Sequence, residues 1–583
     1  MSSTDWQEIA SERKRKQEDL IPLEWRIPSP PDGLLDVTLI PQACGLLTAR
    51  ELEITDTIDV NVILSKLGNG IWSAVEVTKA FLKRAIIAHQ LTNCLTEIFI
   101  ERALERALKL DQFLKKNGRT MGPLHGLPVS LKDQFCMEGL ETIMGYVSWV
   151  GKVSDHDAAI VEILYELGAV PFVRTNVPQT LMWGETFNTV FGRTTNPFNR
   201  KLTPGGSSGG EGALVALRGS PLGIGTDIGG SVRIPAGFTG IYSLRPCYGR
   251  LPYEGAANVL EGQEAITSAI GPMASDISAL KTFAKAVLDA KPWNKDPLVL
   301  RKPWNDKEYA LTEHGGEGAQ LCFAVMLDNG LVRPQPPVRR AMSMLVSALT
   351  DAGHKVIDWE NKLHLELHAT SEHIMSADGG EGYRTVCSLT GEPLLQTMMP
   401  HAEQPDPNHP WHAHPTFLDE PFTMTLRNAG KGAISAYELW ELHKKKAEIR
   451  KQYLDHWERT KTRTGTGRPV DAILCPVAPY PAPPHGHNSN DFYTVIWNFL
   501  DYACTAFPVT KVDSSLDLPD PPPDSFYNQE DEAVFKLYDP EVFFNAPVGL
   551  QLVGRTQEEE AVIAMTEIAV SALETWKGVH SKS

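Results

Sequence analysis

The sequence is most informative between Thr203 and Pro246, which reads TPGGSSGGEGALVALRGSPLGIGTDIGGSVRIPAGFTGIYSLRP. This stretch contains two clusters of glycine and serine, one around Ser207 and one that ends at Ser231, 24 residues further along. Glycines beside a serine remove side chains and leave backbone N–H groups free to point at one spot. Such groups stabilise the oxyanion that develops during acyl transfer. The stretch therefore indicates nucleophilic chemistry at a serine.

A single lysine closes an apolar segment upstream of these serines. Residues 122–133 read GPLHGLPVSLKD, and Lys132 stands at the end of a run that predicts a buried strand. A serine hydroxyl needs a neighbouring base, and lysine can act as that base only when it is neutral. Burial lowers the pKa of a lysine because a low dielectric disfavours the ammonium form. Asp133 would raise this pKa, but adjacent strand residues point to opposite faces, which takes its carboxylate away.

Helix and strand signals alternate around both segments. The predicted helices follow capping residues, and two of them end at glycines: 74–87 after Ser73, 158–167 between Asp157 and Gly168, and 211–218 between Ser208 and Gly219. Apolar runs predict strands at 169–174, 222–226, 241–244, 322–326 and 356–359, and a helix at 338–352. Proline-rich stretches predict a surface loop at 400–421 and a flexible insertion at 516–525. The alternation indicates an α/β fold, with Ser231 on a loop that leaves a strand end.

These segments resemble the amidase signature family, and within it the fungal acetamidase branch. The resemblance extends from about Ile63 to Pro246 and resumes at 471–484 (DAILCPVAPYPAPP) and 545–554 (NAPVGLQLVG). It implies the amidase signature fold, a central mixed β-sheet covered by helices on both faces. It also implies a single signature domain at 61–583, with a core at about 63–310 and a more divergent part at 311–583. Residues 1–60 are interpreted from their own sequence as an N-terminal helical arm.

The resemblance further implies a Ser-Ser-Lys triad that needs no cofactor. Carried over position by position, Ser231 matches the nucleophile, Ser207 the bridging serine and Lys132 the base. The expected oxyanion hole is formed by the backbone of Ile228, Gly229, Gly230 and Ser231, with Ser207 beside the substrate.

Three further residues are expected to support the nucleophile loop. Asp227 and Arg233 flank this loop, and we expect an ion pair or hydrogen-bond scaffold that fixes it rather than a role in proton transfer. Ser208 is interpreted either as a helix cap or as an assisting hydrogen-bond donor.

No metal site is predicted. His364 and His368 are four residues apart and would share a helix face, while His409, His412 and His414 cluster among prolines. Neither group is accompanied by an HExxH motif or a pattern of carboxylate ligands.

The composition is that of an ordinary globular protein. Of the 583 residues 42% are hydrophobic and 22% charged, and the net charge of −17 argues against nucleic acid or an anionic membrane as a partner. The basic run 13–16 is interpreted as a solvated helix face. No apolar run reaches the roughly 18 residues of a membrane span, and no signal peptide is recognisable. Eight scattered cysteines indicate reduced thiols, so we expect a cytoplasmic protein.

We therefore expect an amidase that hydrolyses a small carboxamide to a carboxylate and ammonia through an acyl-enzyme. Two alternatives stay open: the glutaminase subunit of a tRNA amidotransferase, and a non-catalytic binding protein on an amidase fold. A short aliphatic amide is the first choice of substrate, and an aryl or indole acetamide or a secondary-metabolite intermediate stays open. Leu181, Met182 and Trp183 are candidate pocket residues. Homodimerisation is left open.

Overall fold

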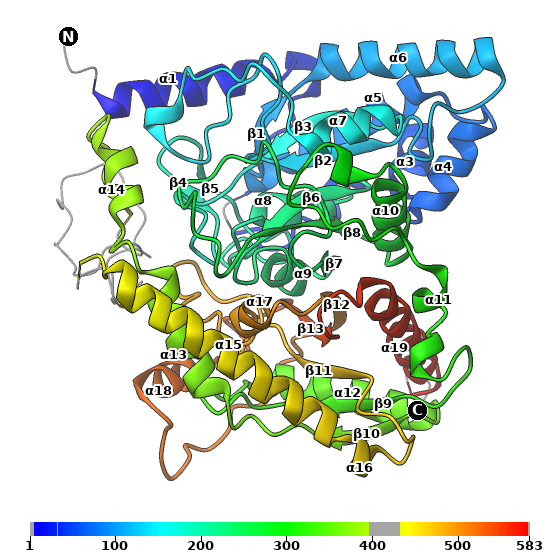
Figure 1. Ribbon diagram of the computed structural model, residues 1–583. Coiled ribbons are helices and arrows are strands. Elements are labelled where there is room, and N and C mark those ends of the chain that lie inside the picture. The colour runs from blue at the N-terminus through cyan, green and yellow to red at the C-terminus, as the bar shows by residue number, and fades with distance from the viewer. Residues whose placement is uncertain (1–4, 32, 396–431, 581–583) are drawn as a thin grey trace.

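A mixed β-sheet of eleven strands runs through the computed structural model, which describes every residue except 1–4, 32, 396–431 and 581–583 (Figure 1). Its strands, in order across the sheet, are β1 (Leu95–Ile98), β3 (Val170–Thr175), β2 (Pro128–Lys132), β6 (Gly223–Asp227), β8 (Ala269–Ala274), β7 (Tyr242–Arg245), β12 (Cys504–Lys511), β13 (Pro547–Val553), β11 (Ala472–Pro476), β9 (Cys322–Val325) and β10 (Lys355–Asp358). β2 is parallel to β3 and β6, and β9 is parallel to β10 and β11, while the other neighbours are antiparallel. β4 (Phe187–Asn188) and β5 (Gly192–Arg193) form a separate hairpin.

Helices surround the sheet. In chain order they are α1 (Trp6–Asp19), α2 (Ile40–Ala43), α3 (Ala49–Asp56), α4 (Val60–Gly68), α5 (Ala74–Thr92), α6 (Ile100–Asn117), α7 (Ala159–Glu166), α8 (Gly209–Ala216), α9 (Arg233–Thr239), α10 (Ser278–Asp289), α11 (Asp306–Tyr309), α12 (Pro336–Asp351), α13 (His364–Met375), α14 (Glu381–Ser388), α15 (Ala436–Arg459), α16 (Lys461–Thr464), α17 (Val495–Leu500), α18 (Gln529–Leu537) and α19 (Glu559–His580). Short 3-10 turns occur at η1 (Leu23–Trp25), η2 (Val147–Trp149), η3 (Pro292–Asn294) and η4 (Thr312–His314).

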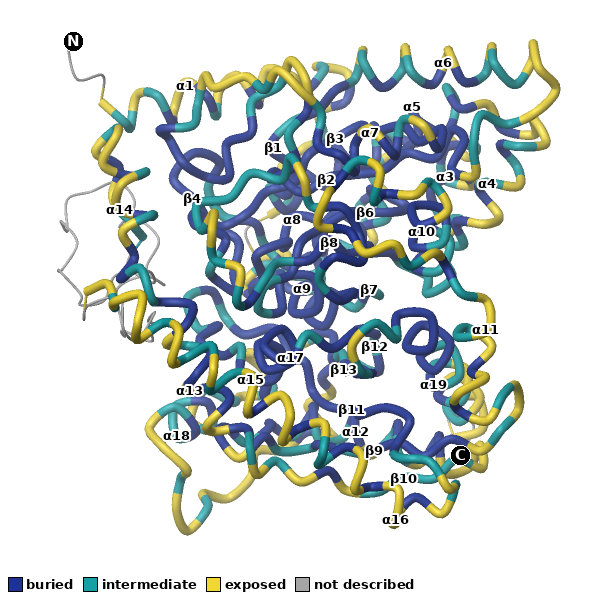
Figure 2. Tube along the Cα trace, in the orientation of Figure 1, coloured by how far each residue is buried: buried dark blue, intermediate teal, exposed yellow. Residues whose placement is uncertain are grey.

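Both faces of the sheet are covered, because alternate residues of one strand join different hydrophobic cores. In β11, Ala472 and Leu474 belong to a core shared with α12 and α19. Ile473 and Cys475, from the same strand, belong to a core shared with α15 and α17. Successive side chains of a strand point to opposite faces, so these two cores flank the sheet. Apart from the edge strand β10, whose residues are partly or fully exposed, its strands form the buried interior of the molecule (Figure 2), and the predicted fold class is confirmed.

The first 60 residues pack onto this body. Trp25 and Ile54 are buried in the core that also holds residues of β2 and β3. Arg13, from the basic run, is only 5% exposed and pairs with Glu97 and, at 2.7 Å, with Glu141. The interpretation of this run as a solvated face is therefore wrong at Arg13, because a charge pattern does not reveal distant carboxylates. The domain boundary at residue 60 stays a prediction.

Local sequence signals placed most elements within a few residues, although not every cap. Ser73 caps α5 as predicted, accepting a hydrogen bond from Glu76 N at 3.0 Å, and the helix runs five residues further than expected. The predicted Asp157 cap is wrong, because its carboxylate accepts from Glu138 N at 2.8 Å while Ala158 occupies the cap position. Ser208 does occupy the cap position of α8, but its side chain makes no capping bond.

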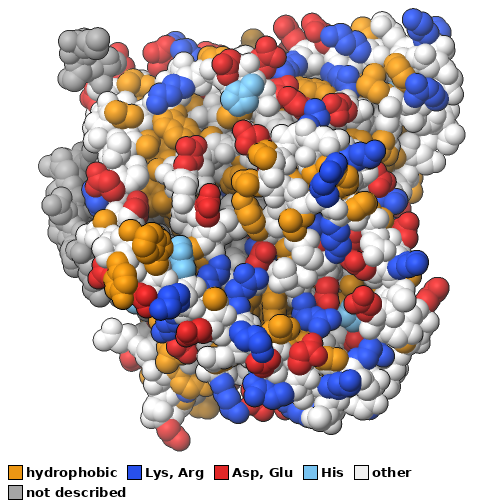
Figure 3. Space-filling view, in the orientation of Figure 1, with side chains coloured by type: hydrophobic (Ala, Val, Ile, Leu, Met, Phe, Trp, Pro, Cys, Tyr) orange, Lys and Arg blue, Asp and Glu red, His pale blue; other side chains and the backbone are white. Residues whose placement is uncertain are grey.

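The predicted strands all form, each within one residue of its expected start. Residues 516–525 contain no helix or strand, and the predicted loop at 400–421 lies outside the described residues. No helix among the described residues is both long and apolar enough to cross a bilayer. Acidic and basic side chains are intermixed on the face shown in Figure 3.

Candidate active site

The predicted site residues gather where two parallel strands end. β2 and β6 are neighbours in the sheet, with Ser130 beside Gly223 and Leu131 beside Ile224. Lys132 is the last residue of β2, and the loop that follows β6 carries Ser231 into α9. Carboxyl ends of parallel strands meet at one edge of a sheet, which brings the two segments together from nearly 100 residues apart. The prediction that Ser231 lies on a loop leaving a strand end is confirmed.

Lys132 is fully buried and has two close hydroxyl partners. Its Nζ lies 2.7 Å from Ser207 Oγ and 2.7 Å from Thr226 Oγ1. Burial lowers the pKa of Lys132 to about 7, against the opposing effect of the Asp227 and Glu211 carboxylates. A substantial fraction of this amine is therefore neutral at pH 7, as a base requires.

Asp133 faces away from the amine, as strand alternation predicts. Its carboxylate lies 3.6 Å from the guanidinium of Arg174, and both side chains are buried. The carboxylate next to Lys132 in sequence is therefore held by another cation.

The two serine loops are in direct contact. The backbone N–H of Ser208 donates to the carbonyl oxygen of Ser231 at 3.1 Å. The peptide bond between Gly206 and Ser207 is cis, which no sequence signal predicted. A Cβ on Gly206 would lie 2.3 Å from the carbonyl oxygen of Glu185, so only glycine fits there. Ser231 is 8% exposed and lines the same cavity as Gly206.

An ion pair holds the loop that carries Ser231, as predicted. Arg233 donates Nε and Nη2 to the two carboxylate oxygens of Asp227, each at 3.0 Å, and both side chains are fully buried. Burial alone would raise the pKa of Asp227, but Arg233 lowers it to about 2. Asp227 also accepts hydrogen bonds from the backbone of Gly230 at 2.8 Å and of Val232 at 3.2 Å. One carboxylate thus fixes both ends of the loop.

The hydrogen bond from Gly230 N–H to Asp227 affects one of the donors expected in the oxyanion hole. Gly230 was expected to offer its N–H to the substrate, yet in this structure that N–H donates to Asp227. Gly230 has a φ of +137°, and a Cβ there would come within 2.4 Å of Thr494 Oγ1. Its lack of a side chain therefore serves the shape of the loop.

A cavity of about 60 Å³ reaches Ser231. The three predicted pocket residues, Leu181, Met182 and Trp183, all line it. Sequence reasoning missed the lining residues that α13, the segment before α17 and the start of α17 contribute, because no local motif marks them: Glu372, Met375, Asn490, Asp491, Phe492 and Val495.

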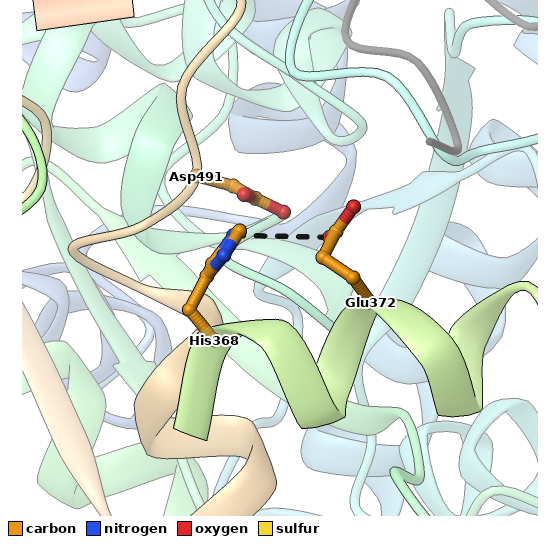
Figure 4. Close-up of side chains that lie close together, drawn as sticks. All are labelled: His368, Glu372 and Asp491. Atoms are coloured by element: carbon orange, nitrogen blue, oxygen red, sulfur yellow. Dashed lines mark ion pairs between the residues drawn. The ribbon is translucent and has the colours of Figure 1, made fainter. Parts of the chain in front are cut away.

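Among the described residues, one group of side chains has the spacing of metal ligands. Figure 4 shows His368 and Glu372 on α13 facing Asp491 from the segment before α17. Their ligand atoms lie within 4.8 Å of one another, and His368 Nε2 is 3.9 Å from Glu372 Oε1. Imidazole with carboxylates is a ligand set suited to Zn²⁺ and related cations.

His364, the other histidine of the predicted pair, does not join this group. His364 Nε2 lies 3.1 Å from the hydroxyl of Tyr453, in a buried aromatic cluster. His409, His412 and His414 lie outside the described residues. The sequence-based expectation of no metal site did not consider the pairing of His368 with Asp491.

Comparisons with known proteins identify relatives of this chain and of its fold. The family described as Amidase matches residues 76–563. An acetamidase of Aspergillus oryzae is 38% identical over 570 residues, 97% of this chain and 98% of the relative. A putative amidase, kk1C, of Curvularia clavata is 39% identical over 577 residues, 98% of this chain and 99% of the relative. The solved structure of a fatty acid amide hydrolase is 33% identical with a TM-score of 0.86, covering 98% of this chain and 95% of that chain.

Fold and relatives together define an amidohydrolase that acts on amides. The chain belongs to the amidase family, in its amidase signature group, which confirms the resemblance seen in the sequence.

Proposed function

We propose that this amidohydrolase converts a small carboxamide to a carboxylate and ammonia through an acyl-enzyme on Ser231. The observation that carries the proposal is the fully buried amine of Lys132, 2.7 Å from Ser207 Oγ. A buried lysine without a carboxylate in hydrogen-bond contact is costly to the fold, which is understandable where a neutral amine is needed.

Acylation begins with two proton transfers. Neutral Lys132 accepts the proton of Ser207 Oγ while Ser207 accepts that of Ser231 Oγ, and Ser231 Oγ attacks the carbonyl carbon of the substrate. The carbonyl π electrons move to oxygen, and the resulting oxyanion is stabilised by backbone N–H groups. With the N–H of Gly230 held by Asp227, this role falls to Ile228, Gly229 and Ser231.

The tetrahedral intermediate then collapses and expels the nitrogen. The C–N bond breaks as Ser207 gives a proton to the leaving nitrogen and regains one from Lys132, so that ammonia departs and the amine is again neutral. Water attacks the ester on Ser231 by the same relay, which releases the carboxylate and restores both serine hydroxyls.

The size of the cavity supports a short substrate. At about 60 Å³ it is far smaller than the roughly 300–1,000 Å³ of pockets for drug-sized ligands, so it suits a short aliphatic amide better than a long acyl chain. Acetamidase relatives that match over nearly the whole chain support a free-standing hydrolase over a glutaminase subunit. The close Lys132–Ser207 contact supports an active enzyme over a non-catalytic binding protein.

Covalent labelling combined with turnover tests the proposal. The wild-type protein should release ammonia from acetamide and react with a fluorophosphonate probe, whereas Ser231→Ala should do neither. Ser220→Ala is the matched control, because Ser220 is a buried serine whose hydroxyl donates to the carbonyl of Leu222 at 2.8 Å. Labelling or near-normal turnover of Ser231→Ala would refute the assignment of the nucleophile.

A further inference from the structure

The amine of Lys132 has a second partner whose hydrogen bonds determine what it can do. Thr226 Oγ1 lies as close to Lys132 Nζ as Ser207 Oγ does, 2.7 Å in each case. Thr226 is on β6 and only 3% exposed, so water does not compete for its hydroxyl. A hydroxyl has one proton to donate and lone pairs to accept with. Which of these faces Lys132 decides whether the amine keeps its own lone pair for Ser207.

Gln134 determines the direction of that hydroxyl. Thr226 Oγ1 lies 2.7 Å from Gln134 Oε1, while Gln134 Nε2 donates to the carbonyl oxygen of Ala257 and to the hydroxyl of Tyr253, both at 2.8 Å. The carbonyl of Ala257 can only accept, so it requires the NH₂ group on its side and leaves Oε1 facing Thr226. The backbone carbonyl oxygen of Gln134 also accepts a hydrogen bond from the backbone N–H of Ala257 at 2.8 Å, so both the backbone and the side chain of Gln134 are held.

The polarity of the chain follows from these contacts. Oε1 of Gln134 can only accept, so the Thr226 hydroxyl donates its single proton to Oε1 and can only accept a hydrogen bond from Lys132. A neutral amine has two N–H groups and one lone pair. With one N–H directed at Thr226, the lone pair is free to take the proton of Ser207.

We propose that Gln134 is a positioning residue for the relay, acting through Thr226 to keep the lone pair of Lys132 available to Ser207. This inference rests on the proposed function of Lys132 as the base. Neither Gln134 nor Thr226 is among the described residues that line the cavity, so their effect should be on turnover and not on substrate binding.

Replacing Gln134 with leucine tests the polarity argument. Without Oε1 as acceptor, the Thr226 hydroxyl is free to turn its proton onto the lone pair of Lys132, where it competes with Ser207. We expect kcat to fall about tenfold, which is the size of one misdirected hydrogen bond, with KM unchanged. Donation to the neutral amine also favours that form, so the midpoint of the pH–rate profile should move to lower pH.

A double-mutant cycle separates this role from a structural one. Thr226→Val lacks the hydroxyl, so adding Gln134→Leu to it should change kcat less than about twofold. The proposal would be overturned if the loss of kcat in the double variant equalled the product of the two single losses. An unchanged kcat and pH midpoint in Gln134→Leu would overturn it as well. Should Gln134→Leu fail to fold, the comparison of Thr226→Ser with Thr226→Val decides. Thr226→Ser keeps the hydroxyl and should retain more of kcat than Thr226→Val. Equal losses of kcat in these two variants would also overturn the proposal.

A matched control and an independent readout complete the experiment. Thr505→Val removes a fully buried threonine hydroxyl from β12 of the same sheet, bonded to Thr566 at 2.5 Å, and should leave kcat and the pH midpoint unchanged. Failure of the proposed function would show itself differently, as turnover by Ser231→Ala, whatever the Gln134 variants do.

Discussion

Replacing Lys132 with methionine should stabilise the folded protein while it abolishes turnover. Burial lowers the pKa of this amine to about 7 in the folded chain, from 10.5 for a solvated lysine. Each tenfold change in proton affinity corresponds to about 1.4 kcal/mol, so burying the amine costs about 5 kcal/mol of folding free energy. The full cost applies where both the folded and the unfolded chain carry the ammonium form. Methionine has similar length and no charge to desolvate.

The sign of the pH dependence follows from the direction of the shift. Because the folded pKa lies below the unfolded one, the unfolded chain binds more protons between about pH 7 and 10.5, so the wild type gains stability as pH rises through that range. The cost is about 5 kcal/mol below pH 7 and about 2 kcal/mol near pH 9. Methionine leaves Ser207 and Thr226 without their amine partner, at about 1 kcal/mol each. The net gain should be about 3 kcal/mol near pH 6 and close to zero near pH 9.

Urea unfolding followed by tryptophan fluorescence, at about pH 6 and about pH 9, measures this difference. Lys79→Met is the control, because Lys79 is an exposed lysine on α5 and its amine is solvated in both states. A stability difference between Lys132→Met and wild type that stays constant with pH, or grows as pH rises, would refute the argument that the folded protein depresses this pKa.

Three further predictions concern turnover. The wild-type kcat/KM should rise about tenfold per pH unit up to pH 7 and then level off, because only the neutral amine accepts a proton; a flat profile between about pH 5 and 8 would contradict this. Asp227→Asn should lower the unfolding free energy by about 3–5 kcal/mol, because it leaves the buried charge of Arg233 without its carboxylate, and thermal melting measures this loss. The same change should move the midpoint of the pH–rate profile to lower pH, because Asp227 raises the pKa of Lys132. Met375→Ala should widen the cavity and raise kcat/KM for butyramide relative to acetamide, and an unchanged ratio would exclude Met375 from acyl selection.

Much of the fold and of the candidate site could be predicted because their signals are local. The apolar run that ends at Lys132 predicted β2, and the glycine clusters around Ser207 and Ser231 predicted loops. The pairing of Asp227 with Arg233 was predictable because both residues flank one short loop. Each of these inferences uses residues within a few positions of one another, where backbone geometry relates spacing to direction.

Features that depend on distant segments could not be predicted in this way. The carboxylate of Asp157 had a competing donor in Glu138 N, which a cap rule does not anticipate. Arg13 was expected in water, yet its partners Glu97 and Glu141 follow about 80 and 130 residues later. Tertiary contacts override a local preference when they satisfy the same group better.

The proton affinity of Lys132 shows the same division between local and distant causes most clearly. That Lys132 lies in an apolar strand is visible from its neighbours, and burial is the dominant cause of its lowered pKa. The opposing charges come from Glu211 and Asp227, on other elements of the fold. The positive charge of Arg233 offsets the negative charge of Asp227. The ion pair that holds the loop carrying Ser231 therefore also limits how far Asp227 raises the pKa of Lys132. Loop geometry and base strength are therefore coupled through one buried carboxylate, and a change at Asp227 alters both.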